Sequence, residues 1–307
     1  MPLDPDTKQL LDMLSEMGME DFSTMTPEQA RGLPLMAPPG SPTAVASVED
    51  RSLATGAGNI PVRVYQPESP SGAGLVYFHG GGWVVGNLDS HDETCRRLCA
   101  GAALAVVSVD YRLAPETPYP GPLDDCFAAT AYVAHNGTEF GIDPQRLAVG
   151  GDSAGGNLAA AVALKARDRQ GPELAFQLLI YPVTDADFKR PSCIENADGY
   201  FLTTRAMQWF WDHYVPEPAR RKEAYAAPLQ AENLANLPPA LVQTAEFDPL
   251  RDEGEAYVAR LRTAGNQVSH SRYDGLVHGF FGMQDAVAAA RPAMAEALAA
   301  LRGALNS

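Results

Sequence analysis

The chain has 307 residues, of which 46% are hydrophobic, enough for the core of one large α/β domain with an appendage, or of two domains. A formal net charge of −15 at pH 7 argues against nucleic acid or an anionic membrane surface as a partner. No apolar run reaches the roughly 18 residues of a membrane-spanning helix, so no stable membrane insertion is expected. The first residues lack the basic and apolar regions of a signal peptide, which predicts a cytoplasmic protein.

The N-terminal part begins with an expected amphipathic helix over residues 4–19. Asp4 can cap this helix, and Pro5 suits its first turn. Residues 34–43 contain four prolines and indicate a linker. The four cysteines show no C-x-x-C pair, which favours reduced, mostly buried thiols over disulfides or a zinc site.

From residue 45 onward, expected strands and helices alternate. Strands are expected at residues 45–53, 60–65, 75–79, 104–110, 146–150, 175–181, 240–245 and 267–273. Helices are expected at residues 90–101, 122–136, 154–169, 252–264 and 284–304. This alternation predicts an α/β fold with a mostly parallel, twisted sheet of about eight strands and helices on both faces.

A serine lies at the junction between one of these strands and the next helix. Gly151-x-Ser153-x-Gly155 follows the strand that ends near residue 150, and an alanine-rich helix follows it. This is the pattern of a nucleophile elbow, in which a sharp turn exposes a serine hydroxyl. The free N–H groups of the following helix favour negative charge beside that serine.

A run of three glycines follows the strand 75–79. Its sequence, His79-Gly80-Gly81-Gly82-Trp83, leaves backbone N–H groups unshielded, so that they can donate to an oxyanion. A dinucleotide-binding loop is excluded because Val85 stands where G-x-G-x-x-G requires glycine. A phosphate-binding loop at the elbow is excluded because Asn157 stands where that motif requires lysine.

Two further polar residues each follow a predicted strand. Asp248 follows the strand 240–245, and His278 follows the strand 267–273. The order Ser153, Asp248, His278 is that of the α/β-hydrolase triad. Asp252 is the alternative acid, although its position favours a charge at the start of a helix.

Five motifs in this order make the chain resemble the hormone-sensitive-lipase-like (GDSAG-type) esterases of the α/β-hydrolase superfamily. They are His79-Gly80-Gly81-Gly82-Trp83, Asp110-Tyr111-Arg112-Leu113-Ala114-Pro115-Glu116, Gly151-Asp152-Ser153-Ala154-Gly155-Gly156, Asp248-Pro249-Leu250-Arg251-Asp252 and His278-Gly279-Phe280. The resemblance covers about residues 60–285.

The resemblance implies a helical cap over the carboxyl ends of the strands. Residues 1–45 and 185–225 would form the cap, and residues 46–184 and 226–307 the hydrolase core. The insertion contains the aromatic helix 207–214. Such a cap would enclose a mostly apolar pocket around the serine. The residues expected to line or border this pocket are Met17, Trp83, Asp152, Phe201, Trp209 and Phe210.

The predicted reaction is hydrolysis of short- to medium-chain acyl esters through an acyl-enzyme intermediate. Ser153 would attack, His278 would act as the base, and Asp248 would orient the histidine. The expected oxyanion donors are the backbone N–H groups of Gly81, Gly82 and Ala154. We expect no metal and no organic cofactor.

Two alternatives remain open at this stage. An amidase or peptidase could use the same triad, because amides and esters share the tetrahedral intermediate. A non-catalytic receptor is the second, since plant gibberellin receptors resemble this family but lack the catalytic histidine. His278 at the matching position weighs against a receptor. A homodimer is compatible with the sequence.

Overall fold

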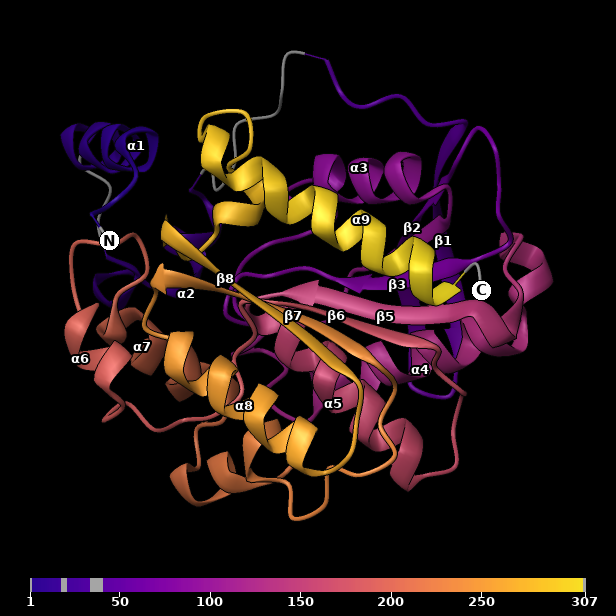
Figure 1. The fold of residues 1–307 in the computed structure, drawn as a ribbon. Coiled ribbons are helices and arrows are strands. Elements are labelled where there is room, and N and C mark those ends of the chain that lie inside the picture. Colours follow the sequence, from indigo (N-terminus) through magenta and orange to yellow (C-terminus); the bar gives the residue numbers. More distant parts are fainter. Residues whose placement is uncertain (1, 18–20, 34–40, 306–307) are drawn as a thin grey trace.

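A twisted sheet of eight strands runs through the centre of the computed structural model (Figure 1), which describes residues 2–17, 21–33 and 41–305. The strand order is β1-β2-β4-β3-β5-β6-β7-β8. Strand β2 is antiparallel to both its neighbours, and all other pairs are parallel, which confirms the expected sheet. The strands are β1 (Ser47–Thr55), β2 (Gly58–Gln66), β3 (Gly74–Phe78), β4 (Ala105–Val109), β5 (Leu147–Asp152), β6 (Phe176–Ile180), β7 (Ala240–Phe247) and β8 (Val268–Val277).

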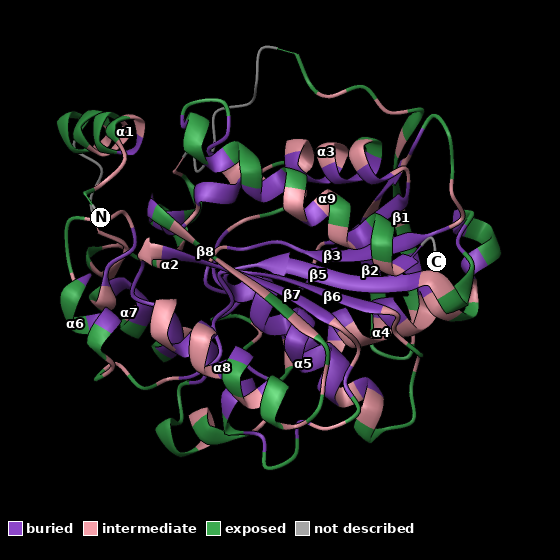
Figure 2. Cartoon of the chain, viewed as in Figure 1, coloured by how far each residue is buried: buried purple, intermediate pink, exposed green. Residues whose placement is uncertain are grey.

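Helices cover both faces of the sheet. On one face lie α3 (Asp92–Ala102) and α9 (Arg291–Leu305), which pack against each other (Figure 1). On the other face lie α4 (Gly121–His135), α5 (Ala154–Asp168) and α8 (Arg251–Thr263). Every residue of β3, β4, β5 and β6 is therefore buried, as the continuous purple of the central strands in Figure 2 shows. Two-sided burial explains why these strands are continuous apolar runs rather than alternating patterns.

Four further helices lie beyond the carboxyl ends of the strands. They are α1 (Pro5–Glu16), α2 (Pro27–Arg31), α6 (Pro191–Glu195) and α7 (Thr204–Tyr214), at the left of Figure 1. A short helical turn over Phe22–Thr24 joins the N-terminal segment to α7. The Phe22 and Phe210 rings lie 5.2 Å apart, and the Asp21 carboxylate accepts a hydrogen bond from Thr203. Segments from two distant parts of the sequence thus meet at the edge of the sheet where the loops after β3, β5, β7 and β8 converge.

The first helix follows the expected capping chemistry but is shorter. The Asp4 carboxylate accepts hydrogen bonds from the N–H groups of Asp6 and Thr7, at 3.0 and 3.1 Å, and Pro5 occupies the first turn. The helix ends at Glu16 rather than residue 19, and residues 18–20 lie outside the described part of the chain. The expected linker also lies largely outside it, because residues 34–40 are not described.

The last helix begins seven residues later than expected. We predicted a helix over residues 284–304, but α9 starts at Arg291, after turns that include Ala288–Ala290. Pro292 explains the difference, because proline has no N–H to donate within a helix and is tolerated only in the first turn. A helix begun at residue 284 would have placed this proline in its interior.

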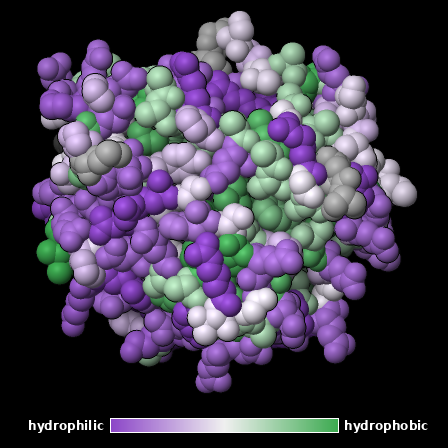
Figure 3. Space-filling view, in the orientation of Figure 1, coloured by the Kyte–Doolittle hydropathy of each residue, from purple (hydrophilic) through white to green (hydrophobic). Residues whose placement is uncertain are grey.

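Hydrophilic residues cover most of the face shown in Figure 3, with a smaller hydrophobic area near its centre. Met13, Met17 and Ile194 are the large hydrophobic residues exposed within the described ranges. No helix in those ranges combines the length and the apolar character that crossing a bilayer requires. The four cysteines are free and buried, as the sequence suggests.

The start of α5 passes very close to the end of β3. A Cβ atom built on Gly155 would collide with the backbone carbonyl of Phe78 and approach that of His79. A Cβ on Gly151 would meet the same Phe78 carbonyl and the backbone of Gly155. The two glycines therefore let the helix approach the neighbouring strand more closely than any other residue type allows.

Alanine substitutions at two glycines should change the stability of the protein in opposite directions, because only one of the two glycines lies in this close approach. Gly155→Ala should lower the free energy of unfolding by about 1–3 kcal/mol, because backbone atoms must move to accept the methyl group. Gly303→Ala is the matched control, because nothing lies within 4 Å of its added Cβ in α9. It should raise the free energy of unfolding by about 0.5–1 kcal/mol. Denaturant titration followed by circular dichroism measures both, and a neutral Gly155→Ala would contradict the packing described.

Candidate active site

Ser153 occupies the sharp turn between β5 and α5. Its backbone angles, φ 55° and ψ −118°, lie in a region that residues other than glycine rarely adopt. Its N–H donates to the carbonyl of Ile180 at 2.9 Å, so β6 holds the strained turn in place. The turn lifts the serine hydroxyl above the sheet and toward the loop after β8, as the nucleophile-elbow pattern predicts.

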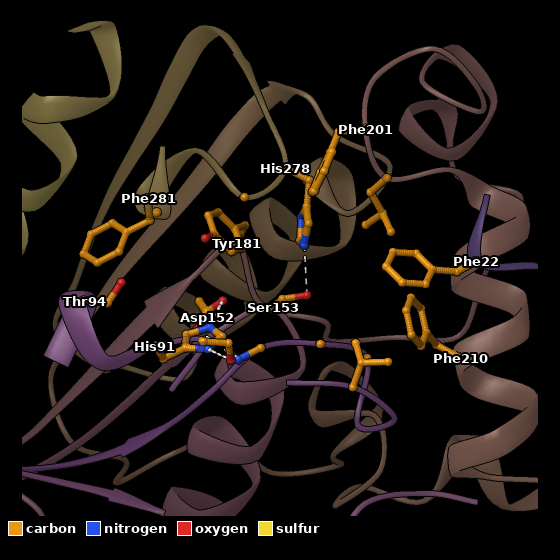
Figure 4. Close-up of a pocket in the computed structure, with 18 of the residues that line it drawn as sticks. Phe22, His91, Thr94, Asp152, Ser153, Tyr181, Phe201, Phe210, His278 and Phe281 are labelled. Atoms are coloured by element: carbon orange, nitrogen blue, oxygen red, sulfur yellow. Dashed lines mark hydrogen bonds and ion pairs between the residues drawn. The ribbon is translucent and has the colours of Figure 1, made fainter. Parts of the chain in front are cut away.

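His278 links the serine to an aspartate. Its Nε2 lies 2.9 Å from Ser153 Oγ, and its Nδ1 lies 2.7 Å from Asp248 Oδ2 (Figure 4 shows the first contact). An ionised carboxylate can only accept hydrogen bonds, so Nδ1 carries the proton. In the neutral ring Nε2 is then free to accept the proton of the serine hydroxyl. The Tyr181 ring, 4.6 Å from the imidazole, packs beside it.

Asp248 is held by its own loop. Its Oδ1 accepts a hydrogen bond from the N–H of Leu250 at 2.9 Å, and the Asn196 amide donates to its backbone carbonyl at 3.2 Å. Asp248 is 1% exposed, so little water competes for its carboxylate. Asp252 faces elsewhere, because its carboxylate accepts from the N–H of Ser192 at 2.8 Å and from Arg251 at 2.9 Å. The geometry therefore brings Asp248, and not Asp252, to the histidine.

The glycine loop after β3 presents two peptide N–H groups beside the serine. The Gly80 carbonyl is 2.7 Å from His79 Nδ1, and the Gly81 carbonyl accepts from the N–H groups of Val84 and Val85 at 3.1 and 2.9 Å. In a trans peptide the N–H points opposite to the C=O. Anchoring these two carbonyls therefore directs the following N–H groups, those of Gly81 and Gly82, the other way.

The three expected oxyanion donors are free to bind a ligand. Within the described residues, the N–H groups of Gly81, Gly82 and Ala154 donate to no protein acceptor. Burial lowers the pKa of His79 to about 4, so its ring is neutral at physiological pH and adds no charge to the loop. The neutral His79 ring contacts the loop through the Gly80 carbonyl.

A cavity of about 130 Å³ opens at Ser153 and is mostly apolar. Phe201 and Phe210 line it, as expected, and so does Asp152 at its floor (Figure 4). Several other lining residues were not predicted from the sequence, among them Phe22, His91, Thr94, Tyr181, Met207 and Phe281. Tyr181 is the last residue of a predicted strand, and Phe281 lies three residues after His278, so both positions carried a usable signal. Phe22 and His91 carried none, because their positions depend on how distant segments pack.

Three residues expected at this pocket lie elsewhere. Trp83 is fully buried and stacks on Tyr214 with ring centroids 4.1 Å apart, because the backbone turns it away from the serine into the core. Trp209 packs against the Phe210 ring, with ring centroids 5.1 Å apart, and does not line the cavity. Met17 is 72% exposed at the end of α1. Among the described residues, no group of three His, Cys, Asp or Glu side chains is arranged to hold a metal ion.

A strained serine between a parallel strand and a helix, bonded to a histidine that is bonded to a buried aspartate, defines a serine hydrolase of the α/β-hydrolase fold. Residues 75–282 match a family model described as alpha/beta hydrolase fold. The chain belongs to the hormone-sensitive-lipase-like esterases of the α/β-hydrolase superfamily.

Known proteins are similar over most of the chain. The esterase LipI of Mycobacterium tuberculosis is 46% identical over 264 residues, which cover 84% of this chain and 82% of LipI. The carboxylesterase NlhH of the same species is 46% identical over 267 residues, covering 85% and 83%. The crystal structure of a thermostable esterase from Pseudomonas putida ECU1011 superimposes with a TM-score of 0.94 at 40% identity, covering 99% of this chain and 98% of the other.

The different partners of the two aspartates lead to a prediction about turnover. Asp248→Asn should lower kcat by several orders of magnitude, because an amide can donate to Nδ1 and favour the wrong histidine tautomer. Asp252→Asn should change kcat less than about threefold, since its carboxylate contacts Ser192 and Arg251 instead. Steady-state ester hydrolysis measures both variants. A larger loss for Asp252→Asn than for Asp248→Asn would show that Asp252 is the acid of the triad.

Proposed function

We propose that the protein is a carboxylesterase that hydrolyses short- to medium-chain acyl esters through an acyl-enzyme at Ser153. The chain of hydrogen bonds from Ser153 to His278 to Asp248, at 2.9 and 2.7 Å, is the observation that carries this proposal. Both similar proteins of M. tuberculosis are named as esterases, which supports the same reaction class here.

Acylation begins when Ser153 Oγ attacks the ester carbonyl and its proton passes to His278 Nε2. Asp248 stabilises the imidazolium that forms. The carbonyl oxygen becomes an oxyanion, which the N–H groups of Gly81, Gly82 and Ala154 bind. Loss of one such donor costs roughly 3 kcal/mol in comparable enzymes. The tetrahedral intermediate then collapses, and Nε2 returns the proton to the leaving alcohol.

Deacylation repeats these steps with water as the nucleophile. His278 takes a proton from a water molecule, which attacks the acyl carbon. The same three N–H groups bind the second oxyanion, and Ser153 leaves with the proton from Nε2. The free carboxylic acid then departs. No step requires a group other than the residues described and the two substrates.

The size of the cavity supports a limit on the acyl chain. About 130 Å³ of mostly apolar space is bounded by rings from the N-terminal segment and from the insertion, including Phe22, Phe201 and Phe210. Each buried methylene contributes about 0.8 kcal/mol until such a pocket is full. A longer chain must then displace these rings or shift the reacting carbonyl, and a shift of about 1 Å can cost roughly a hundredfold in rate. Acyl groups of about four to eight carbons satisfy both conditions.

The same contacts support the domain division that the family resemblance implies. Residues 1–45 and 185–225 would form a cap, and residues 46–184 and 226–307 the hydrolase core. The contact between Phe22 and Phe210 joins the two cap segments over the serine. A cytoplasmic location and a homodimer stay predictions, which fractionation and light scattering would test.

Of the alternatives, the receptor is disfavoured by the hydrogen bond between His278 and Ser153, which a purely binding role does not need. An amidase would use the same groups, so comparison of a matched ester and anilide distinguishes the two. We expect the ester to be turned over faster, because its alcohol is the better leaving group.

The direct test of the proposal is Ser153→Ala. The variant should fold like the wild type and lose essentially all ester hydrolysis, because it lacks the nucleophile. An organophosphate should label the wild type with one equivalent per chain and leave the variant unlabelled, as intact-mass spectrometry can show. Turnover above a few per cent of wild type in the variant would remove Ser153 from the mechanism.

A second prediction concerns acyl-chain length. With a series of p-nitrophenyl esters, kcat/KM should peak at about four to eight carbons and fall for longer chains. Phe22→Ala enlarges the cavity and should move the peak to longer chains. Phe127→Ala, on α4 and away from the cavity, is the control and should leave the peak unchanged. A wild-type profile that kept rising through sixteen carbons would contradict a closed pocket.

A further inference from the structure

The glycine loop has a second anchor, on the side of Gly80 that faces away from its carbonyl. The N–H of Gly80 donates both to Asp152 Oδ1, at 3.0 Å, and to His91 Nε2, at 3.2 Å. His91 Nε2 is itself 3.1 Å from Asp152 Oδ1 (Figure 4). Gly80 immediately precedes the two glycines that supply oxyanion donors, and Asp152 immediately precedes Ser153. This cluster of His91, Asp152 and Gly80 therefore joins the nucleophile to the oxyanion loop.

The backbone of Gly80 packs tightly against the Asp152 carboxylate. A Cβ on Gly80 would collide with Asp152 Oδ2, so the loop rests directly on this carboxylate. Tyr77 donates a further hydrogen bond to Asp152 Oδ1 at 2.8 Å. A shift of the carboxylate would therefore move the loop, and with it the direction of the N–H groups of Gly81 and Gly82.

The hydrogen bonds around His91 determine how its ring is used. Ser90 Oγ lies 2.9 Å from His91 Nδ1, and its only proton goes to the carbonyl of Asn87 at 2.8 Å. Nδ1 must therefore carry a proton and donate to Ser90. A neutral ring then accepts the Gly80 N–H at Nε2, whereas a charged ring donates from Nε2 to Asp152. In the neutral form the N–H of Gly80 bridges Nε2 and the carboxylate, and in the charged form this N–H donates to Asp152 alone, so Asp152 links His91 to the loop in either form.

Asp152 places a negative charge at the floor of the catalytic cavity. Burial alone would raise the pKa of its carboxyl, but the nearby His91 and the hydrogen bonds from His91 and Tyr77 bring the pKa below its usual value. The carboxylate is thus ionised at neutral pH, next to the place where the oxyanion forms. Without a partner, this charge would oppose the negative charge of the transition state more than it opposes the neutral ester.

We propose that His91 is a positioning residue for ester hydrolysis, which holds the oxyanion loop through Gly80 and balances the carboxylate of Asp152. Within the described part of the chain His91 makes no hydrogen bond to Ser153 or His278, so it acts through these two partners. The role rests on the proposed esterase function, because it concerns the oxyanion of that reaction. Because His91 also borders the cavity, its loss would weaken binding of the uncharged ester, but less than it weakens the transition state.

The test compares two substitutions of His91 with a histidine elsewhere. His91→Leu removes all hydrogen bonds of the ring, whereas His91→Gln keeps an amide that can accept from Gly80 and donate to Asp152. His135→Leu, at the exposed end of α4, is the control. We expect His91→Leu to lower kcat by about tenfold to a hundredfold with KM within about threefold, in the range of a misplaced catalytic group. His91→Gln should recover most of the loss, and His135→Leu should match the wild type.

Inhibitor binding separates a positioning role from a loss of folding. The serine adds to the carbonyl of a trifluoromethyl alkyl ketone, and the carbonyl oxygen becomes an oxyanion. The matched methyl ketone binds without forming an oxyanion. His91→Leu should weaken the trifluoromethyl ketone about as much as it lowers kcat, and should weaken the methyl ketone clearly less. Equal weakening of both ketones, or an unchanged kcat, would overturn the proposal.

The partner of His91 can be tested by combining substitutions. Asp152→Asn removes the negative charge, so adding His91→Leu to it should cost clearly less than His91→Leu costs in the wild type. Additive losses would show that His91 does not act through Asp152 and would overturn the proposal. Ser153→Ala reports on the esterase function separately, because its activity is lost whatever the outcome at His91.

Discussion

The active site depends on the close contact between the start of α5 and the end of β3. Gly155 lies against the carbonyl of Phe78, and any side chain there would push the helix away from the strand. This contact sets the serine beside the glycine loop that follows β3. The same approach lets Asp152, one residue before the serine, accept the N–H of Gly80. The serine and the proposed oxyanion donors are thus parts of one packed backbone unit.

The polar groups of this unit are fixed before a substrate arrives. The aspartate decides which nitrogen of His278 carries the proton, and the carbonyls of Gly80 and Gly81 are anchored so that the opposite N–H groups face the cavity. Dipoles that are already aligned need no reorganisation when charge develops, which is why such groups stabilise a transition state more than water does. The strained backbone of Ser153 is maintained by the surrounding sheet and helix.

Structural features that follow from strong local sequence patterns were predicted accurately. Features that depend on contacts between distant parts of the chain were not. Apart from α6, which was not predicted, the strands and helices from residue 45 to 277 differ from the prediction by only a few residues, because two-sided burial and turn residues mark them. The last helix was misplaced where Pro292 overrides an apolar pattern. Trp83 was expected beside the substrate, yet it stacks on Tyr214 in the core, because its neighbouring glycines turn the backbone. Residue type alone does not tell which way such a side chain points.

The sequence by itself determined the α/β fold, the family and the order of the serine, aspartate and histidine, because each follows from motifs a few residues long at the ends of strands. Only the tertiary structure decided that Asp248 and not Asp252 meets His278, that Phe22 closes the cavity, and that His91 reaches Gly80. These pairs come from segments far apart in the chain. Their distances depend on how the sheet twists and how the helices pack, which no local pattern contains.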